Sequence, residues 1–173
     1  MGTQISAVEL QKLEIAPIAA DGGAGTEFEE VPVVHEATFT YEDSEPEAKD
    51  YKDVKGNVYF RTKKPGVVKM NASIGRYDLE TKAKLQGGKY TAGAEGKPGS
   101  WVRPDGAPII EYTVRGTTLD GVRITFPRAE VSASGKANDQ AIGLSLVFTA
   151  LKPTKAGVPV EIWEDGVDET PAV

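Results

Sequence analysis

The stretch from Gly121 to Pro153 constrains the fold of this chain more than any other segment, because it alternates apolar and polar residues over two long runs. In the first run, Val122, Ile124 and Phe126 fall on one side of an extended chain. After a small polar turn, the second run places a longer apolar row on one face, made of Ile142, Leu144, Leu146, Phe148 and Ala150. Strict alternation with a period of two residues is typical of half-buried antiparallel strands. We therefore expect a strand pair whose two apolar rows are buried against each other.

Shorter segments with the same alternation predict further strands along the chain. They cover residues 11–18, 33–42, 57–61, 66–74, 108–115 and 159–163. In residues 33–42 the apolar face would carry His35 beside Ala37 and Phe39, which favours a structural histidine over a catalytic one. Many short strands favour an antiparallel arrangement over an alternating α/β fold. The predicted fold class is mainly β: an antiparallel β-sandwich or barrel of two packed sheets with one short flanking α-helix and a long protruding loop.

One segment, residues 78–86, has the period and the end signals of an α-helix. Asp78 can cap its N-terminus, and Glu80 and Lys84 form an i,i+4 pair on the solvent side. Gly87 ends the segment, since glycine readily takes the left-handed conformation that follows a helix. The side chains expected to contact a sheet are Leu79, Ala83 and Leu85.

The length of 173 residues fits a single domain, which we assign to residues 1–173. Residues 1–30 are expected to form an N-terminal arm with a strand, in which residues 21–26 (DGGAGT) would be a flexible hinge. Residues 43–56 are charged and lack a clean period, so they are expected to form a long loop or a protruding hairpin. Residues 164–173 are expected to be a flexible acidic tail.

The formal net charge of −6 is unevenly distributed along the chain. Residues 21–50 hold ten acidic residues and one lysine, a net charge of −9, whereas residues 51–128 hold fifteen basic and seven acidic residues, a net charge of +8. Two blocks of opposite sign suit self-association through complementary patches, and each block is also what an ordinary solvated surface looks like. The acidic total argues against tight nucleic-acid binding, which needs a clustered basic surface.

Residue types that carry catalysis or bind metals are scarce. The chain has one histidine and no cysteine, so nucleophile systems built on these residues have no support, and we expect no enzyme activity, cofactor or metal site. The acidic run between Glu42 and Asp53 lacks the residue order of a calcium-binding loop. No apolar run approaches the roughly 20 residues of a membrane-spanning helix, so no membrane partner is expected.

Three segments, in order, resemble the phage major tail tube protein family of long-tailed phages and related tail-like systems. The first is a strand, turn and strand over residues 58–74, with Phe60-Arg61 followed by Lys64-Pro65. The second is the helix segment DLETKAKLQGG that begins at Asp78, and the third is FPRAEVSAS, residues 126–134, with the strand after it. Together they span residues 57–153.

The resemblance implies two packed antiparallel sheets with a flanking helix, in six copies that close into a ring. Rings would stack into a tail tube through which DNA and the tape measure protein pass, the DNA without specific binding, and a tail terminator protein would be another partner. The implied location is the virion tail, and the host cytoplasm during assembly. In that family a long loop after an early strand bridges to the next ring, and residues 43–56 occupy that place here. The charged residues expected to act in this assembly loop are Asp43, Glu45, Glu47, Asp50, Lys52 and Asp53.

Two interpretations from other functional classes remain open. Trp101 lies in a segment rich in glycine and proline, residues 89–105, that is expected to be an irregular loop, and Trp163 lies beside another loop. Exposed aromatic rings of this kind would suit a β-sandwich module that binds carbohydrate or peptide, although core or interface anchoring is the commoner role of tryptophan. A β-rich enzyme would need converging titratable groups, which no motif in the sequence brings together.

Overall fold

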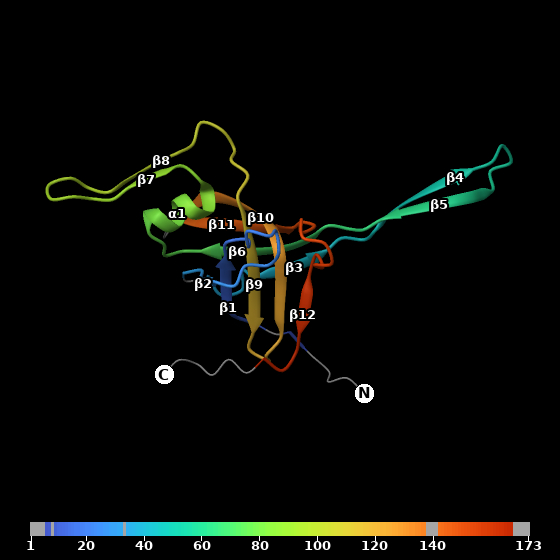
Figure 1. Ribbon diagram of the computed structural model, residues 1–173, viewed down its shortest axis with the longest axis horizontal. Coiled ribbons are helices and arrows are strands. Elements are labelled where there is room, and N and C mark those ends of the chain that lie inside the picture. The colour runs from blue at the N-terminus through green and yellow to red at the C-terminus, as the bar shows by residue number, and fades with distance from the viewer. Residues whose placement is uncertain (1–5, 8, 33, 138–141, 168–173) are drawn as a thin grey trace.

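The structure, a computed structural model, describes residues 6–7, 9–32, 34–137 and 142–167, and it is built around one antiparallel sheet (Figure 1). The eight strands of this sheet follow the order β2-β1-β9-β10-β11-β6-β3, and β12 pairs with β10 beside this path. They are β1 (Leu10–Ala16), β2 (Glu29–Glu30), β3 (Thr40–Asp43), β6 (Val68–Ile74), β9 (Glu111–Thr118), β10 (Arg123–Ala137), β11 (Ile142–Ala150) and β12 (Ile162–Glu164). Two separate strand pairs are β4 (Glu47–Lys52) with β5 (Val58–Lys64) and β7 (Lys89–Thr91) with β8 (Ser100–Val102), and α1 spans Leu79–Gln86.

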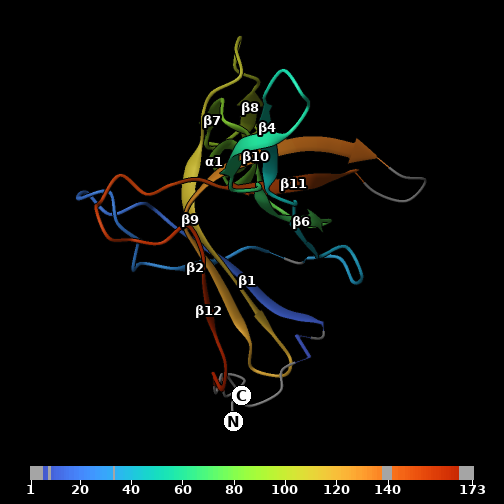
Figure 2. The same cartoon turned by 90° about the vertical axis from the view of Figure 1, so that its right-hand side faces the viewer.

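Strand β10 shapes the sheet, because its two halves pair with different neighbours. The first half pairs with β9 and β12, whereas the second half, from Ala129 to Ala137, pairs with β11. The register with β9 shifts between Phe126 and Ala129, around Pro127, which has no backbone N–H to donate to a ladder. The bend curls the sheet onto itself, so its two halves become the layers of a sandwich-like fold (Figure 2). The predicted mainly β, antiparallel fold class is therefore confirmed.

The core lies between these layers and contains the predicted apolar rows. Leu144, Leu146 and Phe148 of β11 and Phe126 of β10 are fully buried in one apolar cluster. The prediction for Ile142 is wrong: its side chain is 68% exposed, because β11 begins where the β10–β11 hairpin projects beyond the core (Figure 2). The alternation of β6 predicts an inward row of Val68, Met70, Ala72 and Ile74. The last three are buried, and Val68 is half-buried against the same cluster.

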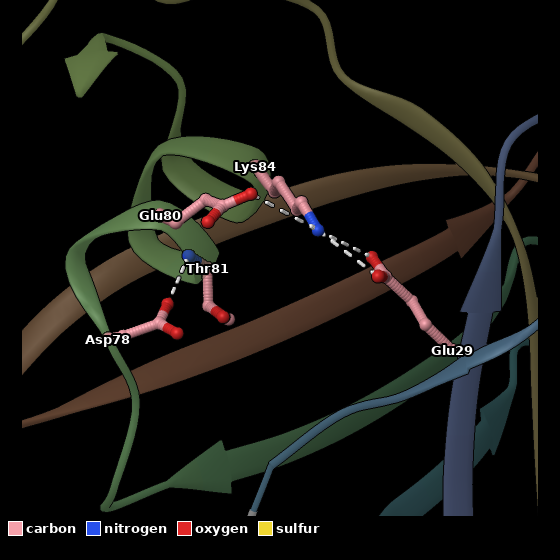
Figure 3. Close-up of polar contacts among 5 residues, drawn as sticks. All are labelled: Glu29, Asp78, Glu80, Thr81 and Lys84. Atoms are coloured by element: carbon pink, nitrogen blue, oxygen red, sulfur yellow. Dashed lines mark hydrogen bonds and ion pairs between the residues drawn. The ribbon is translucent and has the colours of Figure 1, made fainter. Parts of the chain in front are cut away.

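The α-helix begins where the sequence predicts. The Asp78 carboxylate accepts a hydrogen bond of 2.6 Å from the backbone N–H of Thr81, which caps the helix N-terminus (Figure 3). On one side of the helix, Lys84 lies 3.9 Å from Glu80 and 3.1 Å from Glu29 of β2 (Figure 3). The predicted i,i+4 pair is therefore present, and the same lysine also ties the helix to the first layer of the sheet.

The helix joins the core through its last turn. Leu85 is fully buried in the apolar cluster, Ala83 is half-buried, and Leu79 in the first turn is 38% exposed. Leu79 therefore lies outside the buried cluster that Leu85 joins, and its expected contact with a sheet stays a prediction. Gly87 ends the helix with a φ of 77°, as predicted, and its N–H donates to the carbonyl oxygen of Ala83.

Residues 33–42 form less strand than their alternation predicts. Strand β3 begins only at Thr40. Before it lies a turn, in which Ala37 has a φ of 57° and the N–H and Oγ1 of Thr38 both donate to the carbonyl oxygen of His35. The segment pairs with β6 before this turn, where Val34 lies opposite Ile74, and again from Thr40 onward, so the turn interrupts a single ladder. His35 is consequently an exposed turn residue and not part of an apolar strand face.

Residues 21–26, expected to be a flexible hinge, are instead packed on the sheet. The N–H of Gly25 donates a hydrogen bond of 2.7 Å to Oγ1 of Thr113 in β9. A Cβ on Gly25 would lie 2.0 Å from the carbonyl oxygen of Pro17, so this glycine allows close approach of two backbone segments. The glycine-rich composition of this segment therefore serves tight packing and not flexibility.

The end of the chain continues the sheet further than expected. β12 includes Glu164, which pairs with Arg123, so the predicted acidic tail begins as an edge strand. Parts of the predicted elements lie outside the described residues, namely Val33, residues 138–141 of the polar turn and residues 168–173 of the tail. Among the described residues, no helix has the length and apolarity that crossing a membrane requires.

Candidate assembly surface

Two arms project from the sheet toward opposite ends of the longest axis of the molecule (Figure 1). The first arm, residues 45–66, contains β4 and β5, and the second arm, residues 88–103, contains β7 and β8. Each arm is a two-stranded antiparallel ribbon, and no further strand pairs with it among the described residues. Because isolated two-stranded ribbons are marginally stable in water and have free edges, both arms are candidates for contact with another molecule.

Residues 43–56 were expected to form a long loop or a protruding hairpin. Most of them belong to the first arm, so the hairpin is the form that the structure has. The six charged residues expected in the assembly loop are spread along it: Asp43 ends β3, Glu45 lies at the base, Glu47, Asp50 and Lys52 lie in β4, and Asp53 begins the turn. The structure therefore brings them onto one projecting element without gathering them around one ligand. In the described residues, no group of His, Cys, Asp or Glu side chains is placed to hold a metal ion.

Two of these carboxylates stabilise the arm itself. Asp50 accepts hydrogen bonds from Nε and Nη2 of Arg61 on the opposite strand, the second at 2.9 Å, and these bonds lower the pKa of Asp50. Oδ1 of Asp53 accepts the backbone N–H groups of Asn57 and Lys55 at 2.9 and 2.8 Å, which lowers the pKa of Asp53. These side chains therefore organise the strand pairing and the turn of the arm.

The first arm exposes large apolar side chains on β4 and β5. Tyr51 stands opposite Phe60, with the ring centroids 5.7 Å apart, and Val58 follows beyond a register shift, opposite Lys52. The exposed fractions are 37% for Tyr51, 56% for Phe60 and 47% for Val58. Lys49 lies over the Tyr51 ring, 5.1 Å from its centroid. Large apolar side chains this exposed on a projecting ribbon are typical of a surface that another molecule covers.

A joint separates the first arm from the main sheet. The ladder between β3 and β6 and the ladder between β4 and β5 do not run into each other. Pro46 and Pro65, which have no N–H to donate, lie in the gap on the two sides. Ser44 closes the joint, because its N–H donates to the carbonyl oxygen of Val67 at 3.1 Å and its Oγ accepts the N–H of Val67 at 2.6 Å.

The second arm replaces the irregular loop expected for residues 89–105. Trp101 anchors it on the helix: its Nε1–H donates to the carbonyl oxygen of Gly87 at 2.9 Å, and Lys82 lies 4.3 Å from the ring centroid. Sequence reasoning missed this arm, although a signal was present. Two short segments, KYT and SWV, flank the glycine-rich residues 92–99, a pattern typical of a hairpin.

Beside the base of the second arm, a groove of about 510 Å³ runs along the edge of β10. Its apolar lining comes from Leu85, Ile109, Ile110, Val131 and Ala133. The N–H of Val131 donates to the carbonyl oxygen of Ile110 at 2.8 Å, and beyond this point no described strand pairs with this edge. Because backbone N–H groups alternate in direction along a strand, those of Ala133 and Gly135 point to the same open side. Oε1 of Gln86, buried beside the groove, has no hydrogen-bond partner among the described residues.

A second groove, of about 700 Å³, is lined by Tyr41 and Trp163 together with residues of β1. The two rings meet edge to face with centroids 5.3 Å apart, and the Tyr41 hydroxyl donates to Glu161 at 3.0 Å. Burial and this hydrogen bond raise the pKa of Tyr41. These contacts join β3 to β12 where the sheet curls. Trp101 lies in β8, on another part of the fold, so the two tryptophans do not form one binding site (Figure 1).

Comparison with known proteins does not assign this chain to a family. A scan against models of protein families finds no match, and a search of curated proteins finds no relative.

Proposed function

We propose that this protein is a structural subunit that assembles with copies of itself into rings, which stack into a tube of the kind found in phage tails. The resemblance of residues 57–153 to tail tube proteins suggests this architecture, and the arms give it a physical basis. In this proposal six copies form each ring in the virion tail, and DNA and a tape measure protein pass through the lumen.

The observation that carries the proposal is the pair of arms at opposite ends of the long axis (Figure 1). In an isolated copy, the first arm exposes Tyr51, Val58 and Phe60, and no strand of the described residues pairs with its outer edges. Contact with further copies would cover this surface. Different surfaces at the two ends of a subunit make head-to-tail contacts, which generate closed rings or open filaments.

One sheet face has the chemistry that a DNA conduit needs. On the outer side of the layer formed by β3, β6, β11 and β10, cross-strand rows carry small hydroxyl and amide side chains. They include Thr40, Asn71, Ser73, Ser145, Ser132 and Ser134. The charged residues on this face balance in number: Lys69 and Lys136 against Glu42 and Glu130. A wall without a basic cluster binds phosphates weakly, so DNA would slide along it.

The outer face of the other layer is already covered by the chain. Gly25 is hydrogen-bonded to Thr113 of β9, and the Phe28 ring lies 3.7 Å from the guanidinium carbon of Arg115. The hydroxyl-rich face is therefore the better candidate for the lumen wall.

Sedimentation velocity over a concentration series, combined with negative-stain microscopy, tests the proposal. We expect rings or tubes to grow with concentration. Phe60→Ser should reduce assembly strongly, whereas Leu119→Ser is a matched control, since Leu119 is also an exposed apolar residue but lies in the turn between β9 and β10, outside the arm. Small uniform particles of the wild-type protein at every concentration would contradict self-assembly.

A module that binds carbohydrate or peptide is a second candidate, favoured by the 700 Å³ groove with its aromatic wall of Tyr41 and Trp163. In that case Trp163→Ala should abolish binding to an oligosaccharide or peptide library in calorimetry, and Trp101→Ala should leave it unchanged. Absence of binding to every library member by the wild-type protein would remove this candidate.

A further inference from the structure

We infer that the groove along the open edge of β10 receives the first arm of a second copy of this chain. This inference rests on the proposed self-assembly, and it names the surface on which the arm lands. The arm would add its strands to the free edge at Ala133 and Gly135 and place its apolar face, Tyr51 and Phe60, in the groove.

The groove provides the two kinds of interaction that an added strand requires. Among the described residues no strand pairs with this edge beyond Val131, which leaves backbone N–H and C=O groups open at every second residue of β10. Its lining offers apolar side chains from the end of α1 and from residues 103–110. In strand addition, main-chain hydrogen bonds supply affinity and side-chain pockets supply specificity. The unpartnered Oε1 of Gln86 adds an acceptor that is left unsatisfied in the single copy.

The arm provides the matching surface. Both outer edges of the β4–β5 ribbon are unpaired among the described residues, so either strand can extend a neighbouring sheet. Tyr51 and Phe60 form a cross-strand pair on one face, close enough to enter a groove together. A ribbon with an internal ion pair between Asp50 and Arg61 and a capped turn at Asp53 is already shaped before it binds. Preorganisation of this kind lowers the entropic cost of association.

The placement of the two surfaces selects a second copy as the occupant. The groove lies beside the base of the second arm, whereas the first arm points to the other end of the longest axis (Figure 1). The arm of one copy therefore points away from its own groove and toward the position that a neighbour on the same axis would occupy. Such a contact is head-to-tail and can repeat from copy to copy.

Cross-linking between two singly substituted proteins tests the contact. Because the chain has no natural cysteine, only the introduced thiols can react. Lys49→Cys lies on the arm face of Tyr51, and Asp105→Cys lies on the groove rim. Mixed with a short bismaleimide, with one protein carrying a size tag, they should form a mixed dimer. Leu119→Cys is the matched control, because this exposed residue lies in the turn between β9 and β10, away from the groove.

Removal of one edge hydrogen bond provides the second test. Gly135→Pro deletes the N–H on the open side, whereas Gly135→Ala keeps it, and a Cβ at this position meets no atom within 4 Å. The Gly135→Pro variant should keep the wild-type melting temperature and associate about tenfold more weakly, whereas the Gly135→Ala variant should associate normally. When Gly135→Pro is combined with Asp105→Cys in the groove protein, the mixed dimer with the Lys49→Cys protein should be lost.

The outcomes separate this inference from the proposed function. Tubes without the mixed dimer, or equal cross-linking to Leu119→Cys, would overturn the arm-to-groove contact and leave the tube proposal standing. The mixed dimer without rings or tubes would support the contact and contradict the tube. Absence of both association and cross-linking at every concentration would overturn both.

Discussion

Replacement of Phe148 by alanine tests the strand arrangement on which the fold depends. The Phe148 side chain is fully buried, and its residue pairs with Val131 of β10 on one side and Met70 of β6 on the other. Removal of the ring loses transfer free energy and leaves a cavity, so Phe148→Ala should lower the free energy of unfolding by about 3–5 kcal/mol. In a domain of this size each kcal/mol shifts the melting temperature by roughly 2–4 °C, so a fall of roughly 6–20 °C is expected.

Urea and thermal denaturation followed by circular dichroism measure this effect, and Val147→Ala is the matched control. Val147 is the next residue along β11, points to the outer face and is half-buried, so its truncation should cost roughly 1 kcal/mol or less. If Phe148→Ala unfolded within about 1 kcal/mol of the wild-type protein, or if Val147→Ala were the more costly change, the assignment of the two faces of β11 would be refuted.

Three further predictions concern other parts of the molecule. Gly87→Val should destabilise the protein by about 1 kcal/mol or more in urea, since Gly87 has a φ of 77° and a Cβ there would lie 2.5 Å from Pro108; a stabilised variant would contradict this helix end. Burial raises the pKa of Glu14, but hydrogen bonds from Arg115 and Lys12 outweigh it and leave the pKa below its usual 4.5. The stability that Glu14 contributes is therefore complete above pH 4.5 and is lost as the pH falls through the lower folded-state pKa; Glu14→Gln should remove this part of the pH dependence in urea unfolding at pH 7 and pH 3. Raised salt should slow assembly in light scattering, because it screens the oppositely charged blocks, and an unchanged rate would exclude their role.

The residues of single segments determined much of the fold without tertiary information. The alternation of Leu144, Leu146 and Phe148 predicted the buried face of β11, because side chains of a strand alternate between its two sides whatever the strand pairs with. Asp78 and Gly87 predicted the limits of α1, since capping depends on the backbone within a few residues of the helix end. For the candidate assembly site, the charge and position of residues 43–56 were enough to predict a projecting element and to allow for a hairpin.

Other features of the site depended on contacts between distant segments. The alternation at residues 33–42 did not become one long strand, because a turn closed by hydrogen bonds from Thr38 to His35 interrupts its pairing with β6. The strands of the second arm had a local signal, but its attachment did not, because its anchor, Trp101, rests on a helix that precedes it by more than a dozen residues.

Strand β10 shows most clearly which features the local sequence determines and which depend on tertiary packing. Its sequence specifies a long strand with apolar residues on one face, which local alternation can encode. Only the tertiary structure decides that β9 leaves this strand after Glu130 while β11 follows it to Ala137, because each pairing is a choice among distant partners. The resulting free edge, and the projection of the first arm to the opposite end of the molecule, therefore arise from packing between segments. A period-two pattern predicts which face of a strand is buried, but it does not predict which edge of the strand is left without a paired neighbour.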